Sequence, residues 1–473
     1  MPIGKAAAAL LLVAGPLGGC TADEKAAPTP SPTPIRYTAG AAGIGDPYFP
    51  TYGNGGYDVA GYDLKLRYDP KTDVLAGTAT ITATATQNLS RFDLDLAHLK
   101  TTAVTVDGRA AQSTQSEDEL VITPPAGIAK GTAFTTVVSY SGKPVPLNNA
   151  ELGVGGWLTT KDGAFALGQP ESASTWYPVN DHPADKATWR LAMTVPDGLE
   201  VLSNGVPGPR SSANGWTTWT WTESAPMASY LSTVLIGRYR VTTGTHAGRP
   251  MITAVSESLP ANGPAARSLA RTGEIVDFLA SRFGPYPFDA YGGIVLDDPR
   301  VAYALETQTR PVYGNAFFST GPNPIVLVHE LAHQWYGDSV ALERWPDIWL
   351  NEGFATYAEW LWEEHTGMRT VEQSFDHEYN SFDWQQAPGN PGADHLFGPA
   401  VYLRGAMTLY AVRKAIGDQA FAGLLKSWAA AHRDGNVTTA EFMQAARQAA
   451  GKDLGSLFQT WLYGTEKPPH PRT

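Results

Sequence analysis

Two patterns of hydrophobic and polar positions divide the chain. From about residue 57 to residue 242, apolar and polar residues alternate in short runs separated by Gly, Pro, Asn and Asp. Alternation with a period of two is typical of strands with one buried face, and many short strands without intervening helices favour a β-sandwich-like domain. The clearest predicted strands are residues 78–86, 92–96, 104–106, 120–123 and 134–140.

The pattern changes near residue 262, where helical spacing begins. Residues 265–283 have the apolar spacing of a helix, strands are expected near Ile294 and Val301, and the chain beyond Asn323 is predicted to be almost wholly helical. The predicted helices in that last part are residues 324–336, 346–365, 400–415, 418–432, 439–450 and 454–462.

A chain of 473 residues exceeds one hydrophobic core, so at least two domains are expected. The two patterns therefore predict a multidomain α+β protein. An antiparallel β-sandwich-like domain is expected at residues 45–243, and a mostly helical domain at residues 244–473.

The strongest chemical signal is an H-E-L-A-H sequence inside one predicted helix. The helix is expected to begin at the Asn-Pro pair 323–324, and Gly337 can end it. At 3.6 residues per turn, His329 and His333 lie one above the other on one helix face, so both imidazoles can reach a single metal ion. Glu330 projects beside them, which indicates a metal site with an adjacent base.

The third metal ligand follows from chain geometry. A second predicted helix begins at Pro346 and contains Glu352. In an antiparallel hairpin, His333 lies about 6 Å before the end of the first helix and Glu352 about 9 Å into the second, so their heights match. Two histidines, one glutamate and an open position are the ligands of catalytic zinc. We therefore predict one Zn²⁺ per chain bound by His329, His333 and Glu352, with Glu330 as general base.

Composition narrows the range of partners. The formal net charge is −12 and the pI is about 5.3, whereas nucleic acids and anionic membrane surfaces require a basic face. Nucleic acid is therefore excluded as a partner. Nothing in the sequence indicates the oligomeric state.

The N-terminus predicts export. Lys5 precedes an apolar run, residues 6–13, which is too short to span a bilayer but suits the core of a signal peptide. The single cysteine, Cys20, follows Leu-Gly-Gly, an arrangement that resembles a bacterial lipobox. Residues 1–20 are thus predicted to be a signal peptide with a lipidated Cys20, and residues 21–44 an extended Pro/Thr/Ala-rich linker. The alternative is an ordinary secretory signal with a coincidental cysteine.

Several segments together resemble the aminopeptidase N family of zinc metallopeptidases, which belongs to the gluzincins. The resemblance rests on H-E-L-A-H-Q-W with W-L-N-E-G-F-A at residues 349–355, on G-P-Y-P-F at residues 284–288 and on K-A-T-W at residues 186–189. It covers about residues 45–465 and implies a thermolysin-like fold for the catalytic domain. Many members of this family continue into a large C-terminal helical domain. We expect none here and hence a more open active site. The signal peptide and Cys20 separately predict an enzyme anchored in the cell membrane and facing the extracytoplasmic side.

The resemblance also implies roles for four further residues. Tyr402 begins a segment similar to the family's Tyr-Glu-Lys-Gly-Ala, whose tyrosine stabilises the oxyanion. Glu306 lies in a segment similar to Gly-x-Met-Glu-Asn, although Tyr303 and other neighbours differ from it, and Gln169 and Glu171 match Gln-x-Glu. In the family these groups bind the substrate's ammonium group, which implies peptide substrates with a free N-terminus.

Two more side chains deserve a hypothesis. Glu359 lies seven residues after Glu352 on the same helical face and is predicted either to orient a metal-binding histidine or to be an exposed carboxylate. His395 is a candidate for lining the cleft, whereas the other histidines outside the motif show no ligand spacing.

The prediction is therefore an exported zinc aminopeptidase. One alternative is a gluzincin endopeptidase with an open cleft. A second alternative, from another class, is a non-catalytic, zinc-stabilised binding protein of the cell envelope.

Overall fold

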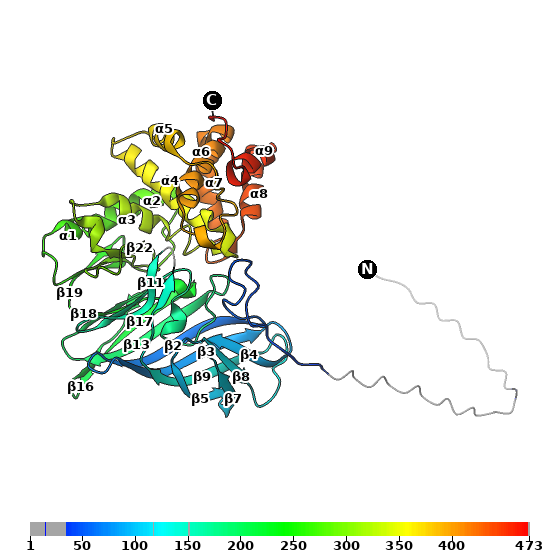
Figure 1. Ribbon diagram of the computed structural model, residues 1–473, viewed down its shortest axis with the longest axis vertical. Coiled ribbons are helices and arrows are strands. Elements are labelled where there is room, and N and C mark those ends of the chain that lie inside the picture. Colours follow the sequence, from blue (N-terminus) through cyan, green and yellow to red (C-terminus); the bar gives the residue numbers. More distant parts are fainter. Residues whose placement is uncertain (1–14, 16–34, 117, 150–151, 472–473) are drawn as a thin grey trace, which may run out of the picture. The chain divides into compact units, whose positions relative to one another are not determined.

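The computed structural model describes residues 15, 35–116, 118–149 and 152–471 (Figure 1). Two predictions concern residues outside this description. They are the signal peptide with its Cys20, of which only residue 15 is described, and residues 21–34 of the linker. From Tyr37 onward the chain forms one compact unit. Within the described residues, no helix is both long enough and apolar enough to span a bilayer.

The alternating pattern of the N-terminal half forms one large sheet and two smaller ones. In β2 and β3 of the large sheet, buried side chains alternate with more exposed ones over most of each strand, as expected for strands with one face in the core. The large sheet contains, in spatial order, β15 (Val206–Pro207), β17 (Trp216–Met227), β13 (Ala187–Pro196), β2 (Tyr57–Asp69), β3 (Val74–Ala85), β9 (Ala133–Gly142), β5 (Lys100–Val106) and β6 (Arg109–Ala110), with β16 (Ser211–Ala213) on β17.

The smaller sheets pack on the large one through aromatic side chains. Phe92 of β4 (Leu89–Asp95) packs on Tyr57 of β2 and on Phe134 of β9. Trp157 of β11 (Gly153–Thr159) meets Tyr68 of β2 edge-on, with ring centroids 5.0 Å apart. One small sheet is β1 (Thr38–Ala39), β4 (Leu89–Asp95), β8 (Glu119–Thr123) and β7 (Gln112–Gln115). The other is β10 (Leu147–Asn149), β11 (Gly153–Thr159), β12 (Ala164–Leu167), β18 (Val234–Gly237) and β14 (Glu200–Ser203). The predicted β-sandwich-like domain is confirmed.

The five predicted strands fall in β3, β4, β5, β8 and β9 to within one residue. Strand β1, at Thr38–Ala39, lies inside the segment 21–44 that was predicted to be a linker. It pairs with β4, so the last part of that segment belongs to the N-terminal sheets. The predicted domain boundary between residues 243 and 244 falls inside β19, a strand of the next sheet.

The second domain begins with a mixed sheet that ends in a short edge strand. In order, its strands are β19 (Tyr239–His246), β20 (Arg249–Ser256), β21 (Tyr291–Leu296), β23 (Val312–Gly314) and β22 (Ala304–Leu305). The α-helices are α1 (Pro264–Leu269), α2 (Thr272–Phe283), α3 (Pro324–Ala332), α4 (Trp349–His365), α5 (Val371–Ser381), α6 (Gly405–Ile416), α7 (Asp418–Ala431), α8 (Thr439–Ala450) and α9 (Gly455–Phe458). Figure 1 shows the N-terminal sheets below and the helices above, with β22 and α3 near the boundary between them.

Short elements connect the longer ones. The 3₁₀ turns are η1 (Ala173–Thr175), η2 (Ser229–Leu231), η3 (Asn315–Phe318), η4 (Trp345–Asp347) and η5 (Ala393–His395); the π turns are η6 (Ala400–Arg404) and η7 (Gln459–Tyr463); and β24 (Ala341–Leu342) pairs with β25 (Asn436–Val437).

Several helix predictions need correction. The helix predicted at 346–365 begins with the 3₁₀ turn η4, and the helix predicted at 454–462 continues after α9 as the π turn η7. The helix predicted at 324–336 ends at Ala332, with His333 as its C-cap residue. The N–H groups of Gln334 and Trp335 bond three residues back, to Leu331 and Ala332, so the last turn is tighter than an α-helix. The helix predicted at 400–415 begins with the π turn η6. The pattern at 265–283 forms two helices, α1 and α2, rather than one. Helix α5 was not among the predicted helices, although Thr370 and Gln373 form a capping box at its start.

Candidate active site

Helix α3 positions the two histidines of the H-E-L-A-H sequence. The Asn323 side chain accepts hydrogen bonds from the backbone N–H groups of Ile325 and Val326, so the predicted N-cap is confirmed. His329 lies in the last turn of the helix, and His333 is its C-cap residue. Both imidazoles therefore lie at the C-terminal end of α3.

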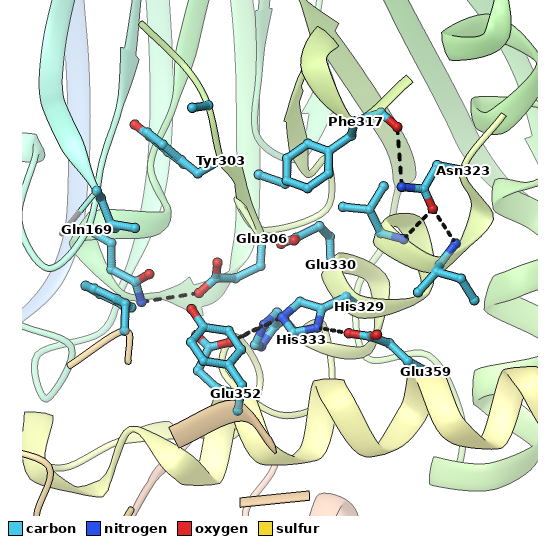
Figure 2. Close-up of a pocket in the computed structure, with 17 residues that line it drawn as sticks. Gln169, Tyr303, Glu306, Phe317, Asn323, His329, Glu330, His333, Glu352 and Glu359 are labelled. Atoms are coloured by element: carbon cyan, nitrogen blue, oxygen red, sulfur yellow. Dashed lines mark hydrogen bonds and ion pairs between the residues drawn. The ribbon is translucent and has the colours of Figure 1, made fainter. Parts of the chain in front are cut away.

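Helix α4 packs against α3 and supplies the carboxylate. Oε2 of Glu352 lies 3.2 Å from Nε2 of His329 and 3.3 Å from Nε2 of His333 (Figure 2). The donor atoms of the three residues all lie within 4.8 Å of one another. The predicted hairpin thus brings the three predicted ligands together in the way that the chain geometry required.

The hydrogen bonds of the two imidazoles fit a metal site. Nδ1 of His329 lies 2.6 Å from Oε1 of Glu359, and Nδ1 of His333 lies 3.0 Å from the carbonyl oxygen of Tyr336. Carbonyl and carboxylate oxygens only accept, so each Nδ1 carries a proton. In the neutral form of each ring, Nε2 is then the free lone pair, and it faces Glu352, as in a metal-binding histidine. Two lone pairs and a carboxylate facing one point can hold a metal ion, and two His and one Glu are the ligand set of catalytic zinc.

Glu330 is buried on the same side of α3, at 5 % exposure. One of its carboxylate oxygens lies within 4.8 Å of ligand atoms of both His333 and Glu306. Burial raises the pKa of Glu330 to about 8, although His329 and His333 act in the opposite direction. By contrast, His333 and His329 hold the pKa of Glu352 at about 2 in spite of its burial.

Glu306 follows the edge strand β22 and belongs to the same cavity. Its Oε1 accepts a hydrogen bond from the hydroxyl of Tyr230 at 3.1 Å, and Nε2 of Gln169 lies 3.5 Å from the same oxygen (Figure 2). Nε2 of Gln334 on the chain after α3 donates to the Glu306 carbonyl oxygen at 3.0 Å. Burial raises the pKa of the Glu306 carboxyl, while His333 lowers it.

Glu171 lies in a smaller cavity beside the main one. The two cavities share Gln169 and Tyr303 as wall residues, and the smaller one has a volume of about 30 Å³. The Glu171 carboxyl forms a hydrogen bond with the side chain of Tyr52, and burial near Asp181 raises its pKa to about 8. The structure thus places Glu171 next to the cavity that holds Glu306, but not in its wall.

Tyr402 lies in the π turn η6 and is a wall residue of the main cavity. Its ring is stacked on that of His329, with centroids 5.9 Å apart and an interplanar angle of 22°. His395, by contrast, is exposed and is not a wall residue of the cavity, so that prediction is wrong. Phe397, two residues further on, takes the place that was predicted for His395.

The main cavity has a volume of about 400 Å³. Besides the polar groups described above, its walls are formed by the apolar and aromatic residues Leu152, Ala302, Tyr303, Ala304, Phe317, Ile325, Val326 and Phe397. Sequence reasoning did not find Tyr230, Phe317 or Phe397 as site residues. Tyr230 and Phe317 lie in the 3₁₀ turns η2 and η3, and Phe397 lies in a connecting segment, where no periodicity marks the side that faces the cavity.

Comparisons with known proteins agree with this geometry. Residues 272–461 match the family model "Peptidase family M1 domain", and residues 59–231 match "Peptidase M1 N-terminal domain". Aminopeptidase N of Lactobacillus delbrueckii subsp. lactis is 28% identical over 446 residues, which are 87% of this chain and 51% of that protein. Aminopeptidase N of Canis lupus familiaris is 33% identical over 209 residues, 41% of this chain and 21% of that protein. The chain spans about half the length of the first of these relatives.

Solved structures cover nearly the whole described chain. The crystal structure of an M1 zinc metallopeptidase from Deinococcus radiodurans has a TM-score of 0.82 and 30% identity, and covers 91% of this chain and 99% of its own. A mutant of an M1 zinc metallopeptidase from Deinococcus radiodurans bound to a Tyr-ser-ala substrate has a TM-score of 0.83 and 29% identity, with the same coverage. Together with the converging ligands, these matches confirm one Zn²⁺ as the cofactor.

Proposed function

Since the chain belongs to peptidase family M1, a family of zinc metallopeptidases, we propose that it is an aminopeptidase that removes N-terminal residues from peptides. One observation supports the register of cleavage above all others. The buried Glu306 carboxylate lies within 4.8 Å of Glu330 and of the metal ligand His333, measured between their ligand atoms. An ammonium group held there can place only the first peptide bond at the metal.

The residues of the cavity divide the reaction among them. Bound by His329, His333 and Glu352, the metal supplies Lewis-acid polarisation of water and of the scissile carbonyl group. Glu330 accepts a proton from the attacking water and later donates it to the leaving amine. Glu306 holds the substrate's ammonium group through charge-assisted hydrogen bonds.

Three other residues support this reaction. Gln169 and Tyr230 fix the Glu306 carboxylate through its Oε1 atom. We assign to Tyr402 the donation of its hydroxyl hydrogen to the developing oxyanion, and its position in the cavity wall with its ring stacked on His329 supports this role. An aminopeptidase N relative and a substrate-bound M1 structure support peptides as the substrate class.

A panel of aminoacyl arylamides, assayed with and without a chelator, tests this proposal. We expect hydrolysis that the chelator abolishes and that added zinc restores. Peptides with an acetylated N-terminus are expected to resist cleavage, because they lack the charge that Glu306 binds. Equal cleavage of free and acetylated peptides would indicate an endopeptidase with an open cleft instead. No cleavage of either, with zinc bound, would favour the non-catalytic binding protein.

We also propose that the protein is exported and anchored in the cell membrane, facing the extracytoplasmic side. The apolar run at residues 6–13 and the Leu-Gly-Gly-Cys sequence ending at Cys20 support this proposal. Labelling with a fatty-acid analogue in a bacterial host is expected to modify the wild type, and Cys20→Ala should lose the label and move to the soluble exported fraction. An unlabelled wild type would leave the ordinary secretory signal as the explanation.

A further inference from the structure

A short segment before β2, residues 46–52, contacts both domains at the edge of the cavity, and we call it the N-terminal strap. Its first residue, Asp46, is 3 % exposed and accepts hydrogen bonds from the backbone N–H groups of Tyr48 and Phe49. The strap is therefore folded around a buried carboxylate rather than lying loosely on the surface.

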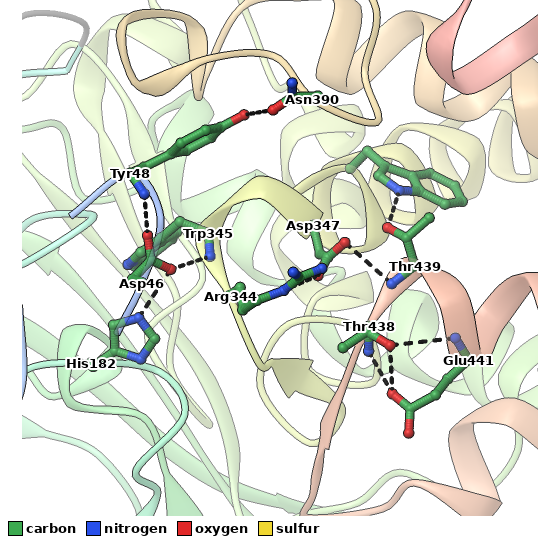
Figure 3. Close-up of polar contacts among 11 residues, drawn as sticks. Asp46, Tyr48, His182, Arg344, Trp345, Asp347, Asn390, Thr438, Thr439 and Glu441 are labelled. Atoms are coloured by element: carbon green, nitrogen blue, oxygen red, sulfur yellow. Dashed lines mark hydrogen bonds and ion pairs between the residues drawn. The ribbon is translucent and has the colours of Figure 1, made fainter. Parts of the chain in front are cut away.

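Asp46 also joins the strap to both domains (Figure 3). Its Oδ2 accepts a hydrogen bond from the backbone N–H of Trp345 at 2.8 Å and lies 3.3 Å from Nε2 of His182. Nδ1 of His182 accepts from the N–H of Ala184, so Nε2 carries the proton that is donated to Asp46. Burial raises the pKa of Asp46, but the hydrogen bonds from His182 and Trp345 outweigh this and lower it.

Trp345 links this contact to the substrate side of the cavity. It belongs to η4, directly before the helix α4 that carries Glu352. Its ring packs against that of Tyr230 at 5.6 Å, and the hydroxyl of Tyr230 donates to Glu306. The ring of the strap residue Phe49 also meets the Trp345 ring edge-on, with ring centroids 6.3 Å apart.

Tyr48 extends the strap to the connection between α5 and η6. Its hydroxyl donates to Oδ1 of Asn390 at 2.5 Å (Figure 3). The same hydroxyl accepts from the backbone N–H of Gly392 at 2.9 Å. The same connection contains the cavity residue Phe397 and leads directly into Tyr402. The Tyr48 hydroxyl is thus one of the groups that hold this connection. Arg404 also holds it, through the carbonyl oxygens of Trp384 and Gln386.

Tyr52, at the other end of the strap, reaches the smaller cavity. Its side chain forms a hydrogen bond with Glu171 and is stacked on Phe49, with ring centroids 4.6 Å apart and an interplanar angle of 8°. This stacking holds Tyr52 against Phe49 in the middle of the strap. The strap therefore contacts η4, the turn before α4, the connection that contains Phe397, and the carboxyl of Glu171.

We propose that the N-terminal strap positions the walls of the substrate cavity and that Tyr48 is its positioning residue for the wall that contains Phe397. The inference rests on the proposed aminopeptidase function only for the meaning of that wall as a substrate wall. Tyr48 does not line the cavity, so it acts through the connection that it holds.

The variant Tyr48→Phe tests this directly, because it removes the hydroxyl and keeps the ring. Losing hydrogen bonds worth roughly 1 kcal/mol should raise KM for aminoacyl arylamides about three- to tenfold while kcat stays within about twofold. Tyr37→Phe is the matched control, since Tyr37 precedes the strap, packs on Gly127 and does not line the cavity. A KM unchanged from that of the control would overturn the proposal.

Hydrogen exchange gives a second measurement that needs no activity. The amides of Gly392, His395 and Gly398 donate hydrogen bonds in this connection. In Tyr48→Phe we expect faster exchange across residues 383–399, with no change elsewhere and none in Tyr37→Phe. Unchanged exchange in these residues would overturn the proposal even in a protein without peptidase activity. Absence of hydrolysis by the wild type would contradict only the proposed function.

Discussion

The metal ligands come from two helices that follow each other in the chain, whereas the groups predicted to hold the substrate's amine come from both domains. His329, His333 and Glu352 need only the packing of α3 on α4. Glu306 lies beyond β22 of the catalytic domain, but its partners Gln169 and Tyr230 belong to the N-terminal domain. One end of the cavity is built locally and the other at a domain interface.

Because of this difference, substitutions at the two ends of the cavity are expected to change different properties. The helix hairpin can assemble the metal site inside one domain, so changes at the amine end should leave metal content intact. Register and substrate affinity, by contrast, depend on how the two domains meet. Variants that affect one end alone are therefore the sharpest way to test the comparison.

The largest effect is expected at Glu330. Glu330→Ala should bind zinc normally and lose about a thousandfold in kcat, because general acid–base catalysis contributes about 10²–10⁴-fold. Metal analysis and steady-state kinetics of the same preparation measure both properties. A variant with full zinc content and an unchanged rate would remove Glu330 from the mechanism.

A smaller effect is expected at the amine end. Glu306→Gln keeps an acceptor for Tyr230 but removes the charge, so kcat/KM for free peptides should fall on the order of a hundredfold. Zinc content should not change, because the ligands lie on α3 and α4. Loss of zinc in this variant would contradict the independence of the two ends.

Within the metal end, Glu359 provides a test of orientation. Its carboxylate lies 2.6 Å from Nδ1 of His329 and is outside the group of metal-ligating atoms. Glu359→Gln should weaken zinc affinity about tenfold, since such partners of ligating histidines typically contribute that much. Glu372→Gln, a change of an exposed carboxylate in the first turn of α5, is the control. Competition with a chromophoric chelator measures the affinities, and equal values would show that Glu359 is only a surface group.

The smallest effect is a pH dependence at Glu171. Its pKa is raised by burial, and by Asp181, Asp118 and Glu119, to about 8, with Tyr52 as the hydrogen-bond partner that acts against this. The folded state therefore binds more protons than the unfolded one between about pH 4.5 and 8, so stability falls as the pH rises through this range. Glu171→Gln should lose less thermal stability between pH 6 and pH 8 than the wild type does.

The pH dependence of KM tests whether Glu171 also contacts the substrate. A neighbouring ammonium group favours the ionised carboxylate, so KM of the wild type is expected to fall a few-fold from pH 6 to pH 8. The substrate's own amino group titrates near pH 7.7–8.0, and the difference between wild type and Glu171→Gln removes that contribution. Parallel KM profiles of the two proteins would show that Glu171 does not contact the substrate.

The sequence by itself determined the elements whose buried positions follow a short period, which are strands and helices. Alternation located the strands of the N-terminal domain, and the 3.6-residue spacing placed His329 and His333 on one face and Glu359 on the face of Glu352. The N-cap at Asn323 was also evident, because capping depends on neighbouring residues only.

Only the tertiary structure decided what is formed by residues distant in the chain. It placed Tyr230 against Glu306, Tyr48 against Asn390 and Phe397 in the cavity wall, and it left His395 exposed. Loops and turns have no periodicity that states which side faces inward, and contacts between domains depend on how whole surfaces fit together. Local chemistry is thus sufficient to predict the metal ion, whereas substrate recognition depends on packing that no short segment contains.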